Sequence, residues 1–369
     1  MKISTEKFMD AFATLKSYAE MSSDSSTGFI QFKLDGSSLR LLTMNAASCC
    51  QISGIEVEEA STVPSLFSMR VEMIDSVVKT VSTAKLEFVQ DVETNRMIVK
   101  NGATYVLNYV SYPEESISME SLVWTPLAIA DASQYIDKMT LFTAADSGSP
   151  ALCGICIANG NGYAFNLYEG IRVEGFPKIE AAPFDADAAS VFGSFKKDQL
   201  VEIARDAGKI YFRQGSIVVA SRLYGDEYPW SDVDRLMGQS PTIVFGVRML
   251  QLKAAVNRSA IFFKDAKLGN GRVQMMVSDG EVLWSVQSLE QNQRLEQRLD
   301  LQVEEVLEQL RPPDGLTLQV SHGFLKNLVR VFSDEIAIEF RISKGTAQVS
   351  KGSTVCFTSV RQSSAKVEA

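Results

Sequence analysis

Few side chains in this sequence have a type and spacing suited to catalysis or metal binding. The only histidine is His322, and no nucleophile is recognisable near it, so general acid–base chemistry lacks a pair. We expect His322 to cap a helix or to face solvent at its start. Cys153 and Cys156 have C-x-x-C spacing, but no second pair accompanies them. Because positions i and i+3 of a strand point to opposite faces, we expect no metal there.

Glycine-containing segments do not supply a nucleotide site either. Gly208 and Lys209 are followed by Ile210, without the first glycine and the hydroxyl of a phosphate-binding loop. Residues 159–162 (Asn-Gly-Asn-Gly) join two predicted strands, which is typical of a hairpin and not of a dinucleotide cradle. We therefore expect no catalytic residue, no metal and no cofactor. An enzyme with its site between repeated domains is an alternative, and it requires a pocket with converging titratable groups.

The elements around these residues repeat along the chain. Six segments have apolar residues at helical spacing, and they are 5–19, 68–81, 131–145, 195–206, 248–259 and 321–332. The first, third and fifth begin 126 and 117 residues apart, and the second, fourth and sixth begin 127 and 126 apart. One third of the 369 residues is 123. The spacing predicts three copies of a unit with two helices.

Between the helices the sequence alternates short strands with tight turns. Asp35-Gly36, Asn101-Gly102 and Asp279-Gly280 each separate two strand-like runs, which is a strong local signal for a hairpin. The fold class predicted is α+β, with both helices of each unit on one face of an antiparallel sheet layer. Clusters of proline and polar residues place the boundaries, so we expect domains at 1–120, 121–241 and 242–369.

The amino-acid composition is typical of a globular protein. Hydrophobic residues make up 46% and the mean hydropathy is +0.01, without an apolar run of about 20 residues that would cross a bilayer. The charged N-terminus has no apolar region typical of a signal peptide, and five cysteines are too few for a disulfide framework. We expect a cytoplasmic protein without a membrane partner.

The net charge of −9 argues against nucleic-acid binding unless the charge is unevenly distributed. The six predicted helices carry 13 basic and 9 acidic residues, whereas the remainder carries 23 and 36. Basic helices could therefore line a surface that holds DNA phosphates without reading sequence. The candidate DNA-facing residues are Lys7, Lys16, Arg70, Lys79, Lys138, Lys196, Lys197, Arg205, Arg248, Lys253, Arg258, Lys326 and Arg330. Such residues can equally be an ordinary solvated helix face.

Five stretches resemble the bacterial DNA sliding clamp, the β subunit of DNA polymerase III. Residues 221–229 (Ser-Arg-Leu-Tyr-Gly-Asp-Glu-Tyr-Pro) are similar to the family's S-R-L-x-x-G-x-[FY]-P segment, with one residue fewer before the aromatic. Residues 63–65 (Val-Pro-Ser) resemble its V-P-A start, and 168–173 (Tyr-Glu-Gly-Ile-Arg-Val) its T-D-G-H-R-L turn. Residues 258–262 (Arg-Ser-Ala-Ile-Phe) resemble R-A-A-I-L, and Val360-Arg361 the final M-R. The five occur in the family's order across the chain.

The resemblance implies a processivity factor without catalysis, a ring that encircles double-stranded DNA as a head-to-tail homodimer. The implied dimer contacts are Tyr105 and Leu107 against Ile261 and Phe262, although these apolar residues could simply fill their own cores. The implied partners are a DNA polymerase and a clamp loader, bound through short peptides in an interdomain pocket. The matching pocket residues are Leu152, Gly170, Arg172, Val173, Pro229, Leu236, Cys356, Thr358, Ser359 and Val360.

Some positions depart from the family. Its turn histidine is Ile171 here, its Pro-Met pair is Ser359-Val360, and residues 363–369 extend past its usual end, so the peptide preference could differ. The origin could be a bacterial chromosome or a phage. An alternative is an interaction scaffold with the same fold that does not encircle DNA. For the pocket we expect an apolar groove beside Arg172 and Val360.

Overall fold

The computed structural model describes residues 1–20, 28–44, 47–127, 132–145, 148–189, 195–196, 199–225, 227–263, 271–278, 280–288, 293–302, 310–313 and 315–364. The chain divides into two compact units. Unit 1 contains Met1–Asp137 and Ala182–Gly225, and unit 2 contains Lys138–Ala181 and Asp226–Ala369. The middle third of the chain contributes to both units.

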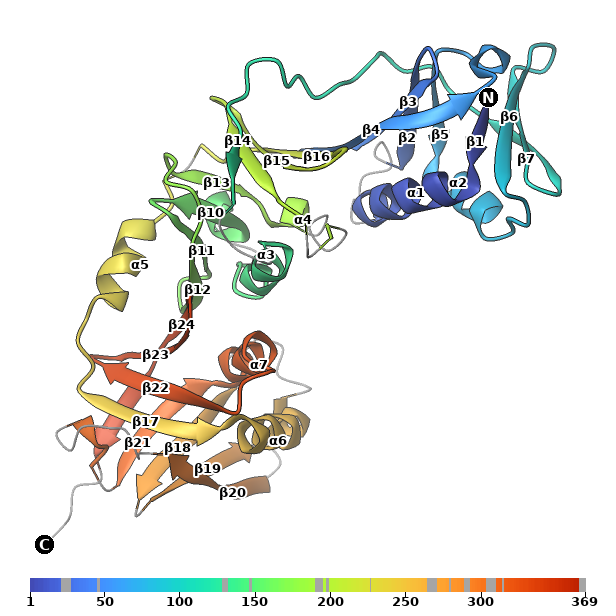
Figure 1. Ribbon diagram of the computed structural model, residues 1–369. Coiled ribbons are helices and arrows are strands. Elements are labelled where there is room, and N and C mark those ends of the chain that lie inside the picture. Colours follow the sequence, from blue (N-terminus) through green and yellow to red (C-terminus); the bar gives the residue numbers. More distant parts are fainter. Residues whose placement is uncertain are drawn as a thin grey trace, which may run out of the picture. The chain divides into compact units, whose positions relative to one another are not determined.

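Unit 1 is built on one extended sheet (Figure 1). Its first elements are β1 (Lys2–Ser4), α1 (Thr5–Glu20), β2 (Phe29–Asp35), β3 (Ser38–Met44), β4 (Ser48–Glu58), η2 (Ala60–Thr62), β5 (Leu66–Arg70), α2 (Val71–Val78), β6 (Lys85–Asp91), β7 (Arg96–Lys100) and β8 (Thr104–Asn108). From the middle third it takes β9 (Thr125–Pro126), β13 (Ala182–Asp185), α4 (Ala186–Ala189), β14 (Glu202–Arg205), β15 (Lys209–Gln214) and β16 (Ile217–Arg222). The strand order is β8-β7-β6-β1-β4-β16-β15-β14-β9, with β3, β2 and β5 continuing from β4.

Unit 2 contains a second extended sheet. From the middle third it takes η3 (Pro150–Cys153), β10 (Gly154–Ala158), β11 (Asn161–Phe165), β12 (Glu169–Glu174) and α5 (Trp230–Met237), while α3 (Ala132–Thr140) spans the division. The last third supplies β17 (Ile243–Arg248), α6 (Met249–Ser259), η5 (Ala260–Phe263), β18 (Arg272–Ser278), β19 (Glu281–Ser288), β20 (Gln293–Gln302), β21 (Leu316–Ser321), α7 (His322–Val331), β22 (Ala337–Ser343), β23 (Thr346–Lys351), β24 (Thr354–Ser359) and β25 (Arg361–Ser364). The order is β10-β11-β12-β24-β23-β22-β17-β20-β19-β18-β21-β25.

The first and last thirds have the same strand pairings, so the expected repeat is confirmed at the level of topology. In the first, β1 pairs with β4 and β6, and in the last, β17 pairs with β20 and β22 in the same way. The hairpins also correspond, with β2–β3 and β7–β8 matching β18–β19 and β23–β24. The middle third follows the same element order. The α+β fold class is therefore correct.

Neighbouring repeats join edge to edge. In unit 1, β16 of the middle third pairs with β4, with Val219 opposite Cys50. In unit 2, β24 of the last third pairs with β12, with Cys356 opposite Ile171. Both joints add the eighth strand of one repeat to the fourth strand of the repeat before it. Because antiparallel pairing satisfies backbone donors and acceptors on both strands, each sheet continues across the joint.

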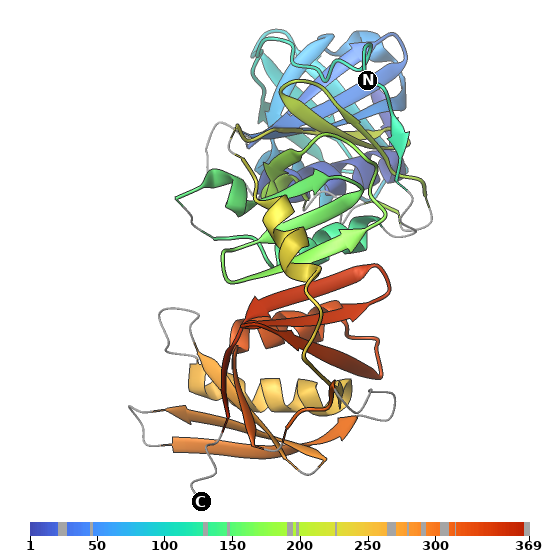
Figure 2. The same ribbon diagram turned by 90° about the vertical axis from the view of Figure 1, so that its left-hand side faces the viewer.

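Each unit has an apolar layer between its helices and its sheet. In unit 1, the ring of Phe8 on α1 lies 6.2 Å from that of Phe32 and 5.7 Å from that of Phe88. In unit 2, Trp284 is fully buried and its Nε1 donates to Ser259 Oγ on α6 at 2.8 Å. Helices α6 and α7 lie side by side in both views (Figures 1 and 2). Buried aromatic rings dominate such cores.

Three of the predicted elements differ from the structure as follows, and one helix was not predicted. Residues 202–205 of the predicted helix 195–206 form strand β14 and pair with β15, because Val201 and Ile203 alternate with polar residues and this period fits a strand. The second helix is shorter than 68–81, because Ser68–Arg70 belongs to β5. Cys153 lies in η3 and not in a strand. Helix α5, which follows Pro229, was not predicted at all.

The hairpin expected at 159–162 is confirmed. Asn159 and Gly160 have φ angles of 49° and 83°, and both occupy the two-residue turn between β10 and β11. Asn and Gly tolerate this left-handed backbone, as a type I′ turn requires. Asp279, in another predicted hairpin, lies outside the described residues.

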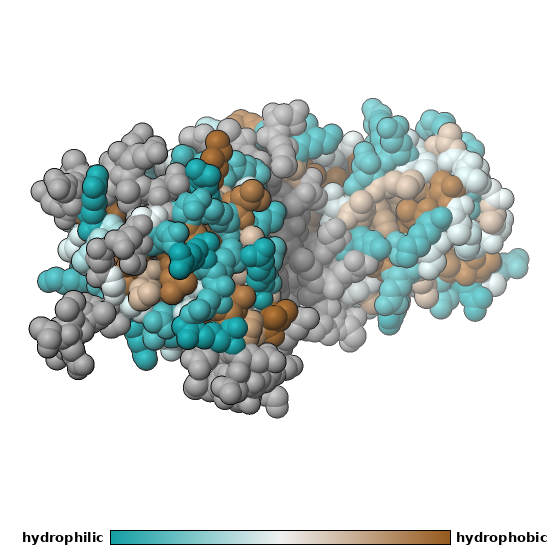
Figure 3. Space-filling model, turned by 90° about the horizontal axis from the view of Figure 1, so that it is seen from below, coloured by the Kyte–Doolittle hydropathy of each residue, from teal (hydrophilic) through white to brown (hydrophobic). Residues whose placement is uncertain are grey.

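Among the helices of the described part of the chain, none is long and apolar enough to cross a membrane. On the face drawn in Figure 3, the coloured hydrophobic residues form small separate patches among hydrophilic ones. Large exposed side chains such as Ile336, 88% exposed, are normal when they occur singly.

Candidate functional site

Helices α6 and α7 present the basic surface that the sequence predicted. Met249, Leu252 and Val256 bury one side of α6, so the remaining positions face solvent. The five predicted cations of these helices and of the end of β17 are all exposed, and they are Arg248, Lys253, Arg258, Lys326 and Arg330. Within the described ranges, none of the five forms an ion pair with a carboxylate. Their charge is therefore available to an external anion.

The cations of α1 and α2 have carboxylate partners. Lys7 Nζ lies 2.7 Å from Glu56, and Asp75 is contacted by Lys79 at 2.7 Å and Lys16 at 3.1 Å. The hydrogen bond from Lys79, followed by that from Lys16, lowers the pKa of Asp75. These pairs partly offset the positive charge of the first third, although surface pairs are weak and can exchange partners.

The other predicted DNA-facing residues are scattered. Arg70 ends β5 and its guanidinium lies 5.1 Å from the centre of the Phe29 ring. Lys138 is half-buried on α3, Lys196 is exposed, and Lys197 lies outside the described residues. Arg205 lies on strand β14, half-buried, and not on a helix. The basic helix face is thus most complete on α6 and α7.

His322 does not face solvent, contrary to our expectation. It begins α7 but is only 8% exposed, with Nε2 3.0 Å from the carbonyl oxygen of Val256 and its ring centre 4.5 Å from that of Phe263. Burial lowers its pKa. The helix cap is Ser321, whose Oγ accepts from the backbone N–H of Phe324 at 3.3 Å. His322 is therefore a packing residue between α6 and α7.

The predicted partner-pocket residues lie mainly along the joint between β12 and β24. Pairing brings Gly170, Arg172 and Val173 next to Cys356 and Thr358. Ser359 ends β24, and Val360, like Leu152 in η3, is buried. Pro229 and Leu236 belong to the start and the body of α5, where the carbonyl of Leu236 accepts from Gln348 Nε2 at 3.1 Å.

The side chain of Arg172 itself lies among polar groups, and the apolar groove that we expected beside it stays a prediction. Its guanidinium contacts Asp234 of α5 at 3.3 Å and Glu174 at 2.9 Å. The hydroxyl of Tyr163 also donates to Asp234, at 2.9 Å. Sequence reasoning missed Asp234 because α5 itself was not predicted. The ion pair of Asp234 with Arg172 and its hydrogen bond from Tyr163 hold α5 against β12 and β11.

Gly170 is required by the packing of this joint. A Cβ at this position would lie 2.6 Å from the ring of Phe357 and 2.7 Å from the carbonyl oxygen of Ala164. We expect Gly170→Ala to lower the free energy of unfolding by about 1–3 kcal/mol, as overpacking does. Urea unfolding measures the loss. Gly225→Ala is the control, because a Cβ there meets nothing within 4 Å, and an equal loss in both variants would contradict the packing argument.

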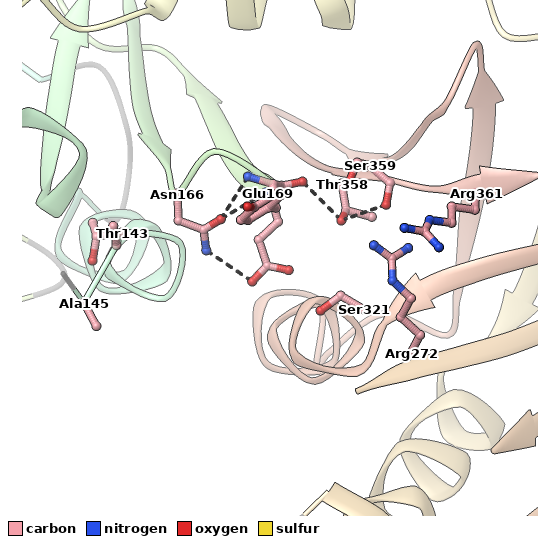
Figure 4. A pocket seen from close by; sticks show the side chains of 11 residues that line it. Thr143, Ala145, Asn166, Glu169, Arg272, Ser321, Thr358, Ser359 and Arg361 are labelled. Atoms are coloured by element: carbon pink, nitrogen blue, oxygen red, sulfur yellow. Dashed lines mark hydrogen bonds between the residues drawn. The ribbon is translucent and has the colours of Figure 1, made fainter. Parts of the chain in front are cut away.

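A polar cavity of about 750 Å³ lies at the end of the same joint (Figure 4). Five segments build it. Thr143, Ala144 and Ala145 follow α3, and Asn166, Tyr168 and Glu169 form the turn into β12. Arg272 begins β18, Ser321 caps α7, and Thr358, Ser359 and Arg361 come from β24 and β25. Only Thr358 and Ser359 were among the predicted pocket residues. Such cavities fall in the size range of ligand sites.

Glu169 is the buried acid of this cavity. It is 9% exposed, its Oε1 accepts from Asn166 Nδ2 at 3.4 Å, and its Oε2 has no hydrogen-bond partner within the described part of the chain. Burial raises its pKa, and the hydrogen bond from Asn166 and the nearby hydroxyl of Ser321 offset this only in part. In the sequence, an acidic residue close to the apolar residues Ile171 and Val173 was the signal that could have indicated the burial of Glu169.

The raised pKa of Glu169 predicts a pH-dependent stability effect. The ionised carboxyl is less favourable in the folded chain than in the unfolded one, so its contribution is intact at acidic pH and is lost as pH rises through the folded pKa. We expect Glu169→Gln to raise the free energy of unfolding by about 1 kcal/mol at neutral pH, and not at a pH where the carboxyl is protonated in both states. Urea midpoints across pH test this, and a gain independent of pH, or a like gain from Glu120→Gln at an exposed site, would contradict it.

The residues expected at a dimer contact are partly or fully exposed, on an edge strand and on a short helix. Strand β8 carries Tyr105 and Leu107, both half-buried, and it is the terminal strand of the unit 1 sheet. Between them Val106 is 51% exposed, a residue that the sequence did not single out. Ile261 in η5 is 63% exposed, and Phe262 is half-buried. An exposed edge strand with apolar side chains is prone to pairing with another chain.

Cys153 and Cys156 form the C-x-x-C pair at which we expected no metal. Neither cysteine forms a disulfide, and Cys156 is buried while Cys153 is partly buried. In the part of the chain that the structure describes, no three His, Cys, Asp or Glu side chains form a group that could hold a metal ion.

A threefold repeat of paired helices on sheets that continue from one repeat to the next is the fold of bacterial DNA sliding clamps, and this chain has that fold. The sliding-clamp structure from Pseudomonas aeruginosa, a DNA polymerase III β subunit, matches with a TM-score of 0.83 at 14% identity, over 98% of this chain and 99% of that one. The β chain from Streptococcus pneumoniae matches with a TM-score of 0.80 at 16% identity, over 98% and 99%. The clamp from Caulobacter crescentus gives 0.80 at 13%, over 98% of both chains. No protein-family model and no curated protein sequence matches.

Proposed function

We propose that this protein is a DNA sliding clamp, a processivity factor that encircles duplex DNA as a homodimeric ring and tethers a DNA polymerase to it. The observation that carries the proposal is the way in which repeats join. The eighth strand of one repeat adds to the fourth strand of the preceding repeat in both units. We assign the three repeats to 1–120, 121–241 and 242–369. Three repeats joined in this way leave two strand edges without a partner, one on the eighth strand of the first repeat and one on the fourth strand of the last repeat.

Those two edges are β8 and the first half of β20. Strand β8 corresponds to β16 and β24, and in the described part of the chain it pairs only with β7. Strand β20 corresponds to β4 and β12. One of its edges pairs with β19, and the other pairs with β17 only at Leu301 and Gln302. Along this second edge, residues 293–297 have no described partner. The edges are complementary, so a second copy can satisfy both in a head-to-tail contact. Such a heterologous contact closes into a ring when the rotation between copies permits it.

The register of this contact follows from the two joints. The joint in unit 1 predicts Val106 opposite Arg294, whereas that in unit 2, shifted by two residues, predicts Val106 opposite Glu296. Tyr105 and Leu107 then lie on one face of the new strand pair, where we place Ile261 and Phe262 as their apolar partners. Apolar residues next to an edge pairing exclude water from it.

The basic helix face supports DNA as the ligand. The five exposed cations of the α6–α7 face carry no described ion pair, while the chain as a whole has a net charge of −9. Phosphate contacts from lysine and arginine do not depend on base sequence. A closed ring needs only weak contacts of this kind, which allow sliding. We assign no catalytic residue, metal or cofactor to the protein, so DNA synthesis is the reaction of the polymerase that it tethers.

We propose that partner proteins dock at the joint of β12 and β24. A partner bound there gains a high effective concentration on the DNA. We propose a polymerase and a clamp loader as these partners, bound through short peptides, and the cytoplasm as the compartment. An interaction scaffold with this fold but without DNA is the alternative, and the uncompensated cations of α6 and α7 favour the clamp.

Sedimentation velocity tests the dimer. We expect the protein to sediment as a dimer at micromolar concentration, and Ile261→Asp to weaken the dimer at least about tenfold, because a buried charge replaces an apolar contact. Ile336→Asp is the matched control, since this isoleucine is 88% exposed in the same unit and lies outside the proposed contact. A wild-type monomer, or equal weakening in both variants, would contradict the assignment.

A further inference from the structure

The polar cavity at the end of the β12–β24 joint has walls of opposite charge. On one wall Glu169, nine-tenths buried, directs its carboxyl into the cavity (Figure 4). Its Oε2 is buried and has no hydrogen-bond partner among the described residues. An unsatisfied buried acceptor is costly to maintain, so it is a candidate to accept a hydrogen bond from a ligand.

Arg272 and Arg361 form the opposite wall. Arg272 lies opposite Ser321 in the pairing of β18 with β21, and Arg361 lies opposite Gln319 in the pairing of β25 with β21. The two strands flank β21, and both guanidinium groups extend toward the same part of the cavity near Thr358 and Ser359 (Figure 4). Both side chains are exposed, and neither forms an ion pair within the described ranges. Two adjacent guanidinium groups attract a planar anion such as a carboxylate.

We propose that this cavity binds an acidic residue of a partner peptide, with the side-chain carboxylate between Arg272 and Arg361 and a backbone N–H donating to Oε2 of Glu169. This inference rests on the proposed docking function and names the chemistry of the peptide that docks. A peptide carries a donor and an acidic side chain within one residue, which matches two oppositely charged walls. The volume of about 750 Å³ accommodates a short segment of chain.

A DNA phosphate fits this cavity less well. At neutral pH a phosphodiester has no donor for Glu169 Oε2, and the carboxylate would repel it at short range. The basic residues of α6 and α7 have no such opposing acid among the described ion pairs. The cavity and the helix face therefore have different ligands, and they can be tested separately.

The test is a titration of the full-length protein, without DNA, by two-dimensional NMR. The probes are acetyl-Gly-Asp-Gly-amide, its Asn counterpart, and dimethyl phosphate, a phosphodiester without a hydrogen-bond donor. We expect the Asp peptide to bind at least about tenfold more tightly than the Asn peptide, since charge-assisted hydrogen bonds are roughly twice as strong as neutral ones. Arg272→Gln and Arg361→Gln should each weaken the Asp peptide about tenfold. Arg298→Gln, at an exposed arginine of the same unit, should not.

Glu169→Gln separates a peptide site from a simple anion site. Removing the acid should weaken the Asp peptide, because its backbone donor loses a charged acceptor. It should strengthen dimethyl phosphate, because this anion has no donor and a repulsive charge is gone. Equal affinity for the Asp and Asn peptides would overturn the proposal. So would a Glu169→Gln variant that binds both the Asp peptide and dimethyl phosphate more tightly. Since the titration contains no DNA, this failure is distinguishable from failure of the clamp function.

Discussion

Reversal of three cations on the α6–α7 face, in the variant Arg248→Glu, Lys253→Glu and Lys326→Glu, is expected to weaken binding to a short linear duplex at least about 100-fold. A ring can slide off the ends of linear DNA, so its equilibrium hold depends on phosphate contacts. Each contact contributes about 1 kcal/mol at a solvated surface, and three give about 100-fold. Fluorescence anisotropy at low salt measures the affinity, and the dependence on salt should become shallower by roughly one unit per lost contact.

The matched control carries the same change of charge elsewhere in unit 2. Arg235, Arg298 and Arg341 are exposed and already pair with Asp232, Glu281 and Glu339. Their triple reversal to Glu should reduce DNA affinity far less, because these residues lie on α5, β20 and β22 and not on the basic helix face. If both variants lose affinity equally, only overall charge matters and the helix face is not the DNA surface.

A covalently closed dimer is the second large effect that we expect. Directly opposed residues of antiparallel strands have Cα atoms about 4.5–5.5 Å apart, within the range of a disulfide. Val106→Cys should therefore cross-link between copies with either Arg294→Cys or Glu296→Cys, whichever register the ring adopts. The substituted side chains are exposed, so the fold should tolerate them. Mild oxidation followed by non-reducing electrophoresis should show a covalent dimer as the major product.

Two features make this cross-link specific. Cys50, Cys156 and Cys356 are buried, and burial raises the pKa of the Cys49 thiol to about 11, so these four thiols react slowly at neutral pH. The partly buried Cys153 is replaced by Ser in all the cross-linking variants. Val92→Cys combined with Arg294→Cys is the control, because Val92 is 80% exposed in the turn between β6 and β7. Cross-linking of the control to the same extent, or of neither designed pair, would contradict the β8–β20 contact.

The sequence predicted those helices whose apolar spacing coincides with their burial. In α1, Phe8, Phe12 and Leu15 follow the helical period and are all buried. Most helically spaced apolar residues of α6 and α7 are buried too, although Leu250 is 80% exposed. The segment 195–206 also contains helically spaced apolar residues, but pairing with β15 determines its strand. Tertiary context overrides propensity in such short segments. Helix α5 begins after Pro229 and ends before Gly238, a boundary signal that could have revealed it.

The candidate site was less predictable because its contacts join distant segments. Neither the pairing of Lys7 with Glu56 nor that of Lys16 with Asp75 follows from local spacing. The polar cavity combines the turn before β12 with the starts of β18 and α7 and the end of β24. Position-by-position resemblance to a family named Thr358 and Ser359 but not Glu169, Arg272 or Arg361, because their meeting depends on how β21 lies between β18 and β25.

The most direct measurement of the central claim is whether the hold on DNA is topological. The cysteine-bearing protein is mixed with a nicked circular plasmid at low salt, oxidised to close the dimer, and passed through a sizing column at about 1 M salt, where the Debye length falls to roughly 3 Å. We predict that the protein elutes with the circular plasmid and is released when a single restriction cut makes it linear. Loss from the circular plasmid, or retention on the linear one, would contradict encirclement.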